Sequence, residues 1–230
     1  MKHWLITGAN RGLGREFALA ALERGDKVAV TARNPEGLTD LVAHFGAQVV
    51  PLALDVTDRS ECFSVVGQAQ SALGRLDVVV NNAGYGLFGM VEELSEAQMR
   101  RQMEVNFFGL FHMTQAVLPV LRAQGAGHIV QISTVGGVMT FPNLGGYHAS
   151  KWAVEGLSDA LAQEVAGMGI HVTLVEPGPY ATDWSGTSAV HADPNPAYDG
   201  VRTALSTMQL PPEVFGIPAA TRPAILKRVD

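Results

Sequence analysis

The sequence predicts an α/β fold built on a doubly wound parallel sheet of six to seven strands, with helices on both faces. Short apolar segments rich in Val, Ile and Leu alternate with helix-length segments along most of the 230 residues. These apolar segments show no clean alternation with polar residues, which is typical of strands buried on both faces of a parallel sheet. Repeated strand–helix–strand units wind in a right-handed sense and place helices on both sides of the sheet.

The predicted elements follow one another without an intervening linker. The expected strands are His3–Thr7, Lys27–Ala32, Gln48–Leu54, Leu76–Asn81, His128–Ser133 and His171–Val175. The expected helices are Leu13–Arg24, Pro35–Phe45, Thr57–Leu73, Ser95–Gln124 and Tyr147–Met168. We expect Asp55 with Thr57 to cap the third helix, and Ser95 with Glu96 to cap the fourth. Residues 1–230 are therefore expected to form one domain.

Composition limits the classes of function. Apolar residues make up 47% of the chain and charged residues 17%, which is typical of a globular protein. A net charge of −6 argues against nucleic acid or an anionic membrane as the main partner. Cys62 is the only cysteine, so no disulfide framework or cysteine-based metal site is expected. The N-terminus lacks a signal-peptide layout and no apolar run approaches the ~18 residues of a membrane span, so we expect a cytoplasmic protein.

A glycine-rich turn follows the first expected strand. Its glycines let the backbone turn tightly and approach a pyrophosphate at the N-terminus of the next helix. The alternative is a turn without a ligand, but its position between a strand and an apolar helix favours dinucleotide binding. The spacing is Gly-x-x-x-Gly-x-Gly rather than Gly-x-Gly-x-x-Gly. The expected binding residues of this turn are Gly8, Asn10, Arg11, Gly12, Leu13 and Gly14.

The end of the second strand indicates which dinucleotide binds. An NAD site usually places a carboxylate there, on the ribose 2′-hydroxyl, but Thr31–Asn34 contains no acid. Arg33, together with Arg11, is suited to pair a 2′-phosphate. NADP(H) is therefore predicted in preference to NAD(H). The alternative is that both arginines are ordinary solvated surface residues.

Other candidate residues lie where expected strands end. Asp55 and Val56 follow the third strand, where the carboxylate is placed to bind the adenine amino group or to cap a helix. Asn82, Ala83 and Gly84 follow the fourth strand in a sharp exit that suits residues tolerant of left-handed backbone. After the sixth strand the expected cofactor contacts are Pro177, Gly178 and Thr182.

The central candidate is Tyr147-x-x-x-Lys151, whose two side chains share one face of an expected helix. A tyrosine ionises near pH ~10, and an adjacent lysine is expected to lower that value and make a tuned general acid/base. Ser133 ends the fifth strand at the sheet edge where ligands of such folds bind. Asn106 lies within a long apolar helix, where a structural kink and a polar role in the site are both compatible with the sequence.

Together these motifs resemble the short-chain dehydrogenase/reductase family, in its single-domain branch. The matching motifs are Thr7-Gly8-x3-Gly12-x-Gly14, Asn81-Asn82-Ala83-Gly84, Asn106, Ser133, Tyr147-x3-Lys151 and Pro177-Gly178. The resemblance implies a seven-stranded Rossmann sheet and reversible hydride transfer between NAD(P)(H) and an alcohol or carbonyl carbon.

The resemblance also implies a role for each catalytic candidate. Tyr147 would exchange the proton with the substrate oxygen, and Ser133 would hydrogen-bond that oxygen. Lys151 would bind the nicotinamide ribose and lower the pKa of Tyr147. Asn106 would hold a water that connects Lys151 to solvent. No metal is required, and the histidines show no ligand spacing.

Two features depart from the family pattern. The chain stops at Ile225–Asp230, which looks like the helix before a seventh strand, so the C-terminal end looks shortened. Leu210–Gly216 corresponds to a part of the family that is too variable to interpret. Residues 183–210, which follow the catalytic motifs, are rich in Pro, Asp, Ser and Ala and are predicted to form a lid over the site.

The predicted substrate is a hydrophobic carbonyl compound or secondary alcohol, because the expected pocket residues are mostly apolar, although several are equally suited to core or lid packing. These residues are Tyr85, Phe88, Met139, Phe141, Leu144, Tyr180 and Trp184.

A homodimer or homotetramer is predicted from apolar positions on the two long helices, unless those positions face the sheet only. They are Phe107, Phe111, Trp152, Leu157 and Leu161.

The main alternative function is a non-catalytic NADP(H) sensor that regulates a partner protein, although such sensors tend to lose the tyrosine or lysine. A sugar-nucleotide epimerase or dehydratase is disfavoured because the chain has no room for a substrate domain.

Overall fold

The computed structural model describes residues 1–207, 211 and 214–230. Its main sheet has six parallel strands in the order β3-β2-β1-β4-β6-β7. The strands are β1 (His3–Ile6), β2 (Lys27–Ala32), β3 (Val49–Ala53), β4 (Val78–Asn81), β6 (Gly127–Ile132) and β7 (Ile170–Val175). Because the chain starts at the centre and winds outward in both directions, the predicted doubly wound α/β fold is confirmed.

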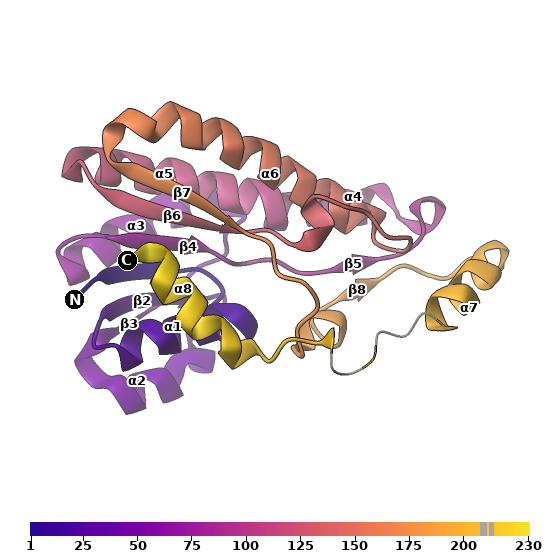
Figure 1. Ribbon diagram of the computed structural model, residues 1–230, viewed down its shortest axis with the longest axis horizontal. Helices are drawn as coiled ribbons and strands as arrows, with labels where there is room; N and C mark the ends of the chain where they lie inside the picture. The colour runs from indigo at the N-terminus through magenta and orange to yellow at the C-terminus, as the bar shows by residue number, and fades with distance from the viewer. Residues whose placement is uncertain (208–210, 212–213) are drawn as a thin grey trace.

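Helices cover both faces of this sheet (Figure 1). On one face lie α1 (Gly12–Glu23), α2 (Thr39–Phe45) and α8 (Thr221–Val229). On the other lie α3 (Arg59–Leu73), α5 (Gly109–Gln124) and α6 (Gly145–Val165), with α4 (Glu96–Met103) leading into α5. The expected C-terminal helix is present as α8, and its Ile225 and Val229 are buried against α1 and the sheet. Burying such a side chain contributes about 1.5–3 kcal/mol.

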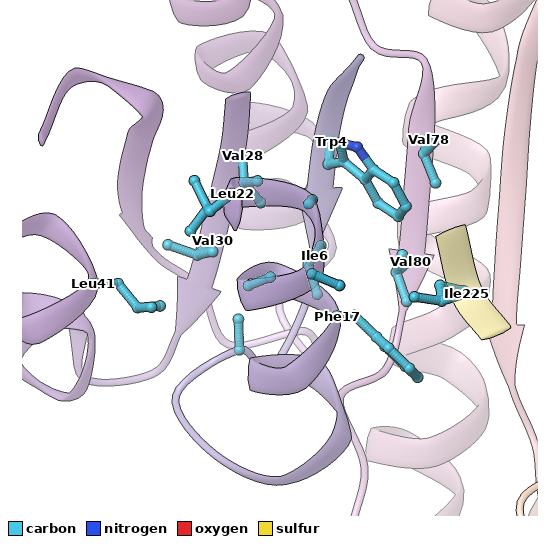
Figure 2. Packing of buried hydrophobic residues seen from close by; sticks show 14 of the residues in the cluster. Trp4, Ile6, Phe17, Leu22, Val28, Val30, Leu41, Val78, Val80 and Ile225 are labelled. Atoms are coloured by element: carbon cyan, nitrogen blue, oxygen red, sulfur yellow. The ribbon is translucent and has the colours of Figure 1, made fainter. Parts of the chain in front are cut away.

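Side chains of the central strands alternate between two cores. Ile6 and Val80 point toward α1, where they meet Phe17 and Ile225 (Figure 2). Leu5 belongs to the opposite core, under α3 and α5. Every second residue of a strand faces the same side, so a strand that is apolar throughout must be covered twice. This explains why the strands lack polar alternation.

The helix caps differ in detail from the sequence expectations. The cap of α3 is Asp58, whose carboxylate accepts hydrogen bonds from the amides of Ser60 and Glu61, and not Asp55 or Thr57. Asp58 is the cap because it lies directly before the first helical residue, where its side chain reaches the free backbone amides of the first helical turn. Ser95 does cap α4, but its capping-box partner is Gln98 rather than Glu96.

The expected helix Ser95–Gln124 is interrupted by a π-helical segment at Glu104–Phe108. Leu161, expected among the surface positions of the long helices, is only 6% exposed and packs in the core beneath α3 and α5. The same core contains Cys62, which is fully buried. Leu161 is inside because α6 turns that face toward the sheet in its C-terminal half.

The segment after β7 crosses to a small second sheet. Here β8 (Val190–His191) pairs in parallel with β5 (Leu87–Phe88), and α7 (Asp199–Thr207) follows at the far end of the molecule (Figure 1). The predicted lid therefore has structure over 183–207, and 208–210 lie outside the described residues. In the part of the chain that is described, no helix combines the length and apolar character needed to cross a membrane.

Candidate functional site

One cavity of about 810 Å³ lies at the carboxyl ends of the strands. The predicted cofactor residues that line it are Gly8, Asn10, Arg11, Gly12, Leu13, Arg33, Asp55, Val56, Asn82, Ala83, Gly84, Tyr147, Lys151, Pro177, Gly178 and Thr182. Ser133 lines the same cavity, whereas Gly14 and Asn106 do not line it. Residues from six strand ends therefore meet in one place, as expected where parallel strands end together.

The glycine turn has the geometry of a phosphate cradle. Gly8 and Gly12 adopt positive φ angles of 65° and 58°, which side chains other than glycine rarely allow. A Cβ added at Gly12 would meet nothing within 4 Å, so this backbone is open to a ligand in the cavity. At Gly14 a Cβ would lie 2.3 Å from the Asn82 amide nitrogen, so only glycine fits there. The residues present thus fit the pyrophosphate of a dinucleotide at the N-terminus of α1.

Asn82 braces this turn from the neighbouring strand. Its side-chain amide donates to the carbonyl oxygens of Thr7 at 2.9 Å and Gly8 at 3.0 Å. The Thr7 hydroxyl in turn accepts from the backbone amides of Asn82 and Ala83 at 2.9 and 3.0 Å. The predicted motif at residues 81–84 therefore holds the glycine turn in shape as well as lining the cavity.

The ends of β2 and β3 carry opposite charges. The Asp55 carboxylate accepts from the Thr57 amide at 3.0 Å and lies 3.8 Å from the Arg101 guanidinium. Burial acts to raise the pKa of Asp55, but the Thr57 hydrogen bonds and the charges of Arg101 and Arg33 outweigh it and lower the pKa. Asp55 is thus ionised and oriented. Arg11 forms an ion pair of 3.4 Å with Asp183 from the segment after β7.

Tyr147 and Lys151 lie in the first turns of α6 and are both buried. The Lys151 Nζ donates to the carbonyl oxygen of Ile132 at 2.7 Å and lies 5.9 Å from the centre of the Tyr147 ring. Burial lowers the pKa of Lys151 to about 8, against the charge of Glu155, which raises it.

The expected lowering of the tyrosine pKa is not found in the protein by itself. Burial raises the pKa of Tyr147 to about 12, and only a side-chain hydrogen bond with Thr134 acts in the opposite direction. The physical reason is that burial removes the phenolate from water, and this destabilises the charged form more than the Thr134 hydrogen bond stabilises it.

Ser133 is buried at the end of β6, and its hydroxyl donates to the carboxylate of Glu155 on α6. The following residue, Thr134, joins β6 to the loop after β7, since its hydroxyl donates to the carbonyl oxygen of Pro177 at 3.3 Å. Ser133 therefore lines the cavity but already has a charged partner on its other side.

Asn106 lies in the π-helical segment and is 1% exposed. Its side chain accepts from the backbone amide of Tyr85 and donates to the Tyr85 carbonyl oxygen, both at 3.0 Å, and it donates to the Ser150 hydroxyl at 3.3 Å. The sequence was compatible with a helix kink and with a polar role at Asn106. The structure has a π-helical irregularity there and polar contacts of the Asn106 side chain. The Asn106 amide contacts Tyr85 and Ser150, and the water that Asn106 is expected to hold stays a prediction.

Aromatic side chains line part of the cavity. Of the predicted pocket residues, Tyr85, Phe141, Leu144, Tyr180 and Trp184 line it. Phe88 and Met139 do not line the cavity, although Phe88 packs on Trp184 with ring centroids 5.2 Å apart. Met139 is 48% exposed because the loop after β6 turns it to the surface.

His148, Arg101 and Glu155 are among the residues of the site that were not identified from the sequence. His148 lines the cavity beside Tyr147, and burial lowers its pKa. Arg101 lines the cavity beside Asp55, and the Glu155 carboxylate accepts the hydrogen bond of Ser133. Only Glu155 carried a usable signal, because it lies one helical turn beyond Lys151 on the same face. Among the described residues, no group of His, Cys, Asp and Glu side chains is arranged to hold a metal ion.

Comparison with known proteins identifies the family. The family model for short chain dehydrogenases matches residues 2–192. The chain belongs to the short-chain dehydrogenase/reductase family. Among its relatives, the oxidoreductase BOA17 of Botryotinia fuckeliana is 49% identical over 81% of this chain and 69% of its own length. A short-chain dehydrogenase structure from Streptomyces avermitilis matches with a TM-score of 0.91 at 39% identity, over all of this chain and 85% of that one.

Two further family structures carry nicotinamide cofactors. The 3-ketoacyl-(acyl-carrier-protein) reductase of Brucella melitensis, in complex with NADH, matches all of this chain and 90% of its own, with a TM-score of 0.84 at 25% identity. ElxO with NADP bound matches all of this chain and 91% of its own, with a TM-score of 0.83 at 25% identity. The short-chain dehydrogenase resemblance is thus confirmed, and the protein is an oxidoreductase of this family.

Proposed function

We propose that the protein transfers a hydride between NADP(H) and the carbonyl or secondary alcohol carbon of a hydrophobic small molecule. One observation carries the proposal. A single cavity is lined by the glycine turn at one end and by Ser133, Tyr147 and Lys151 at the other. A dinucleotide held on the glycine turn would therefore extend to the three polar side chains that can handle the substrate oxygen.

The chemistry follows from the residues around that oxygen. When bound, the nicotinamide supplies or accepts the hydride and, in its oxidised form, adds a positive charge near the tyrosine. Tyr147 donates its phenolic proton to the carbonyl oxygen during reduction, or removes the alcohol proton during oxidation. Ser133 binds the same oxygen and stabilises the charge that develops on it. Lys151 binds the ribose hydroxyls and supplies positive charge beside the phenol.

NADP(H) is proposed over NAD(H) because of the charge around the end of β2. Arg33 and Arg11 both line the cavity, and Thr31–Asn34 contains no carboxylate to bind a free 2′-hydroxyl. Relatives of this fold are found with either cofactor, so the charge on this chain is the argument. The KM for NADPH should be lower than that for NADH, and an equal or lower KM for NADH would refute this preference.

A hydrophobic substrate is proposed because Phe141, Leu144 and Trp184 surround the tyrosine side of the cavity. We also propose that the described part of the predicted lid, residues 183–207, closes over the substrate, since its Asp183 and Trp184 already reach Arg11 and Tyr147.

A homodimer or homotetramer is proposed from exposed apolar side chains on the long helices. Trp152 on α6 is 51% exposed and Phe108 is 38% exposed, while Phe107 and Phe111 stack beside Phe108 with half-buried rings. Light scattering at micromolar concentration should give at least twice the mass of one chain. A monomer would refute the proposal.

The deciding experiment follows NADPH oxidation by its absorbance across ketones, aldehydes, quinones and steroids. Tyr147→Phe should lower turnover by at least about a hundredfold, the size of a general acid's contribution, with NADPH binding nearly unchanged. Unchanged turnover would refute the role of Tyr147. NADPH binding without turnover of any compound would favour the alternative, a cofactor sensor that regulates a partner protein.

A further inference from the structure

The contact between Ser133 and Glu155 is built into the backbone. Ser133 is 3% exposed at the end of β6, and its hydroxyl donates to Glu155, which is half-buried one turn beyond Lys151 on α6. Gly137 covers the pair. A Cβ added there would lie 2.6 Å from both the Glu155 carboxylate oxygen and the Ser133 hydroxyl oxygen.

A serine hydroxyl has a single hydrogen, so it can donate to only one partner. An ionised Glu155 is an acceptor only and takes the Ser133 hydrogen, which leaves Ser133 with lone pairs to offer to the cavity. A protonated Glu155 can instead donate to Ser133, and the Ser133 hydrogen is then free to point into the cavity. A ketone oxygen accepts but cannot donate, whereas an alcohol hydroxyl can donate.

We propose that Glu155 is a positioning residue whose protonation sets the direction of the Ser133 hydrogen, so that Ser133 donates to a ketone when Glu155 is protonated and accepts from an alcohol when Glu155 is ionised. The proposal rests on the function proposed above. Glu155 does not line the cavity and acts only through Ser133.

Burial and the charged groups around Glu155 shift its titration upward. Burial and the negative charge of Glu176, after β7, raise the pKa of Glu155, and these outweigh the Ser133 hydrogen bond and the positive charge of Lys151. Glu155 therefore takes up its proton closer to neutral pH than an exposed glutamate, at ~4.3, does. The pKa of Tyr147 is raised to about 12, so the loss of its acid proton falls at much higher pH.

The first test is the pH profile of kcat/KM for ketone reduction by NADPH between about pH 5 and 8. In the wild type, kcat/KM should fall with rising pH, by up to roughly a hundredfold, the cost of losing one donor to the oxyanion. Glu155→Gln offers Ser133 both a donor and an acceptor but does not titrate, so its profile should be flat to within about threefold. Glu164→Gln, at an exposed position on the same helix, should keep the wild-type profile. An unchanged profile in Glu155→Gln would overturn the proposal.

The second test does not depend on turnover. Carbon-13 NMR of carboxyl-labelled glutamate, with Glu155→Gln used to assign the resonance, should show Glu155 titrating above ~4.3. Ser133→Ala should raise this midpoint further, because the Ser133 hydrogen bond lowers it. A Glu155 midpoint at the ordinary value, or one that Ser133→Ala leaves unchanged, would overturn the proposal. Failure of the wild type to reduce any carbonyl compound would instead refute the proposed function, and the NMR titration would then decide the Ser133–Glu155 coupling by itself.

Discussion

The ring of Trp184 packs against the ring of Tyr147, with 4.9 Å between the ring centroids and 59° between the ring planes. Trp184 comes from the segment after β7, whereas Tyr147 begins α6. Trp184 also packs on Phe88 of β5, which stacks on His191 of β8 with 4.9 Å between the ring centroids. A row of aromatic rings thus links the small second sheet to Tyr147, the proposed acid/base. The segment after β7 is therefore placed to contact a molecule that binds beside Tyr147.

Trp184→Ala should raise the KM for bulky apolar substrates by about tenfold, with a much smaller effect on small ketones. A tryptophan offers a large apolar contact surface, and losing part of it costs on the order of 1–3 kcal/mol of binding. Steady-state kinetics with a small and a bulky ketone would measure this. Phe63→Ala, on α3 away from the cavity, is the matched control and should leave both KM values unchanged. Equal effects on both ketones would contradict the assignment.

Arg33→Ala should raise the KM for NADPH by about ten- to a hundredfold and leave the KM for NADH unchanged. The reason is the loss of a charged hydrogen bond to the 2′-phosphate, which contributes about 1.5–3 kcal/mol. Arg100→Ala, an exposed arginine paired with Glu96 outside the cavity, is the control. If Arg33→Ala raises the KM for NADPH and the KM for NADH by the same factor, Arg33 does not bind the 2′-phosphate.

Gly14→Ala should lower the free energy of unfolding by about 1–3 kcal/mol, the usual cost of forcing a group into a packed site. Its Cβ would lie 2.3 Å from the Asn82 amide nitrogen and 2.6 Å from the Gly8 carbonyl oxygen. Gly67→Ala is the control, because a Cβ there meets nothing within 4 Å and alanine is the better helix former. Urea unfolding should show Gly67→Ala as neutral or more stable. A Gly14→Ala protein as stable as the wild type would show that Asn82 can move away at little cost.

Stability should fall as the pH falls from ~6.5 toward 4, in part because of His128. Burial lowers the pKa of His128 to about 4, and the nearby charges of His171, Arg228 and Lys2 act in the same direction. Between the two pKa values the unfolded chain binds more protons than the folded chain, so the free energy of unfolding rises with pH, by up to about 1.4 kcal/mol per unit.

His128→Gln should remove this part of the pH dependence, since glutamine can still bond the Thr173 hydroxyl, which His128 contacts at 2.8 Å. The exposed His44→Gln should keep the wild-type slope. Urea unfolding at several pH values would compare the three proteins. An identical slope in His128→Gln would assign the effect to other groups.

Much of the candidate site could be predicted because its residues lie at strand ends. Apolar segments identify parallel strands, and the carboxyl ends of such strands converge, so Gly8, Asp55, Asn82 and Ser133 were expected at one edge and do line one cavity. Met139 and Leu161 were misplaced because local pattern does not say which way a loop or a helix face turns. Glu155 was missed because a glutamate on a long helix is usually a solvated residue.

The sequence by itself determined the order of the elements, the parallel sheet, the family and the residue types at the sheet edge, because periodicity and motif spacing are local properties of the chain. Only the tertiary structure decided which groups pair. Ser133 meets Glu155, Arg11 meets Asp183, and Trp184 packs on Tyr147, each between different elements of the fold. It also decided the direction of the Tyr147 pKa shift, since burial raises that pKa where the adjacent lysine predicted the opposite. Partners and desolvation depend on how the elements pack, and neither is encoded in spacing along the chain.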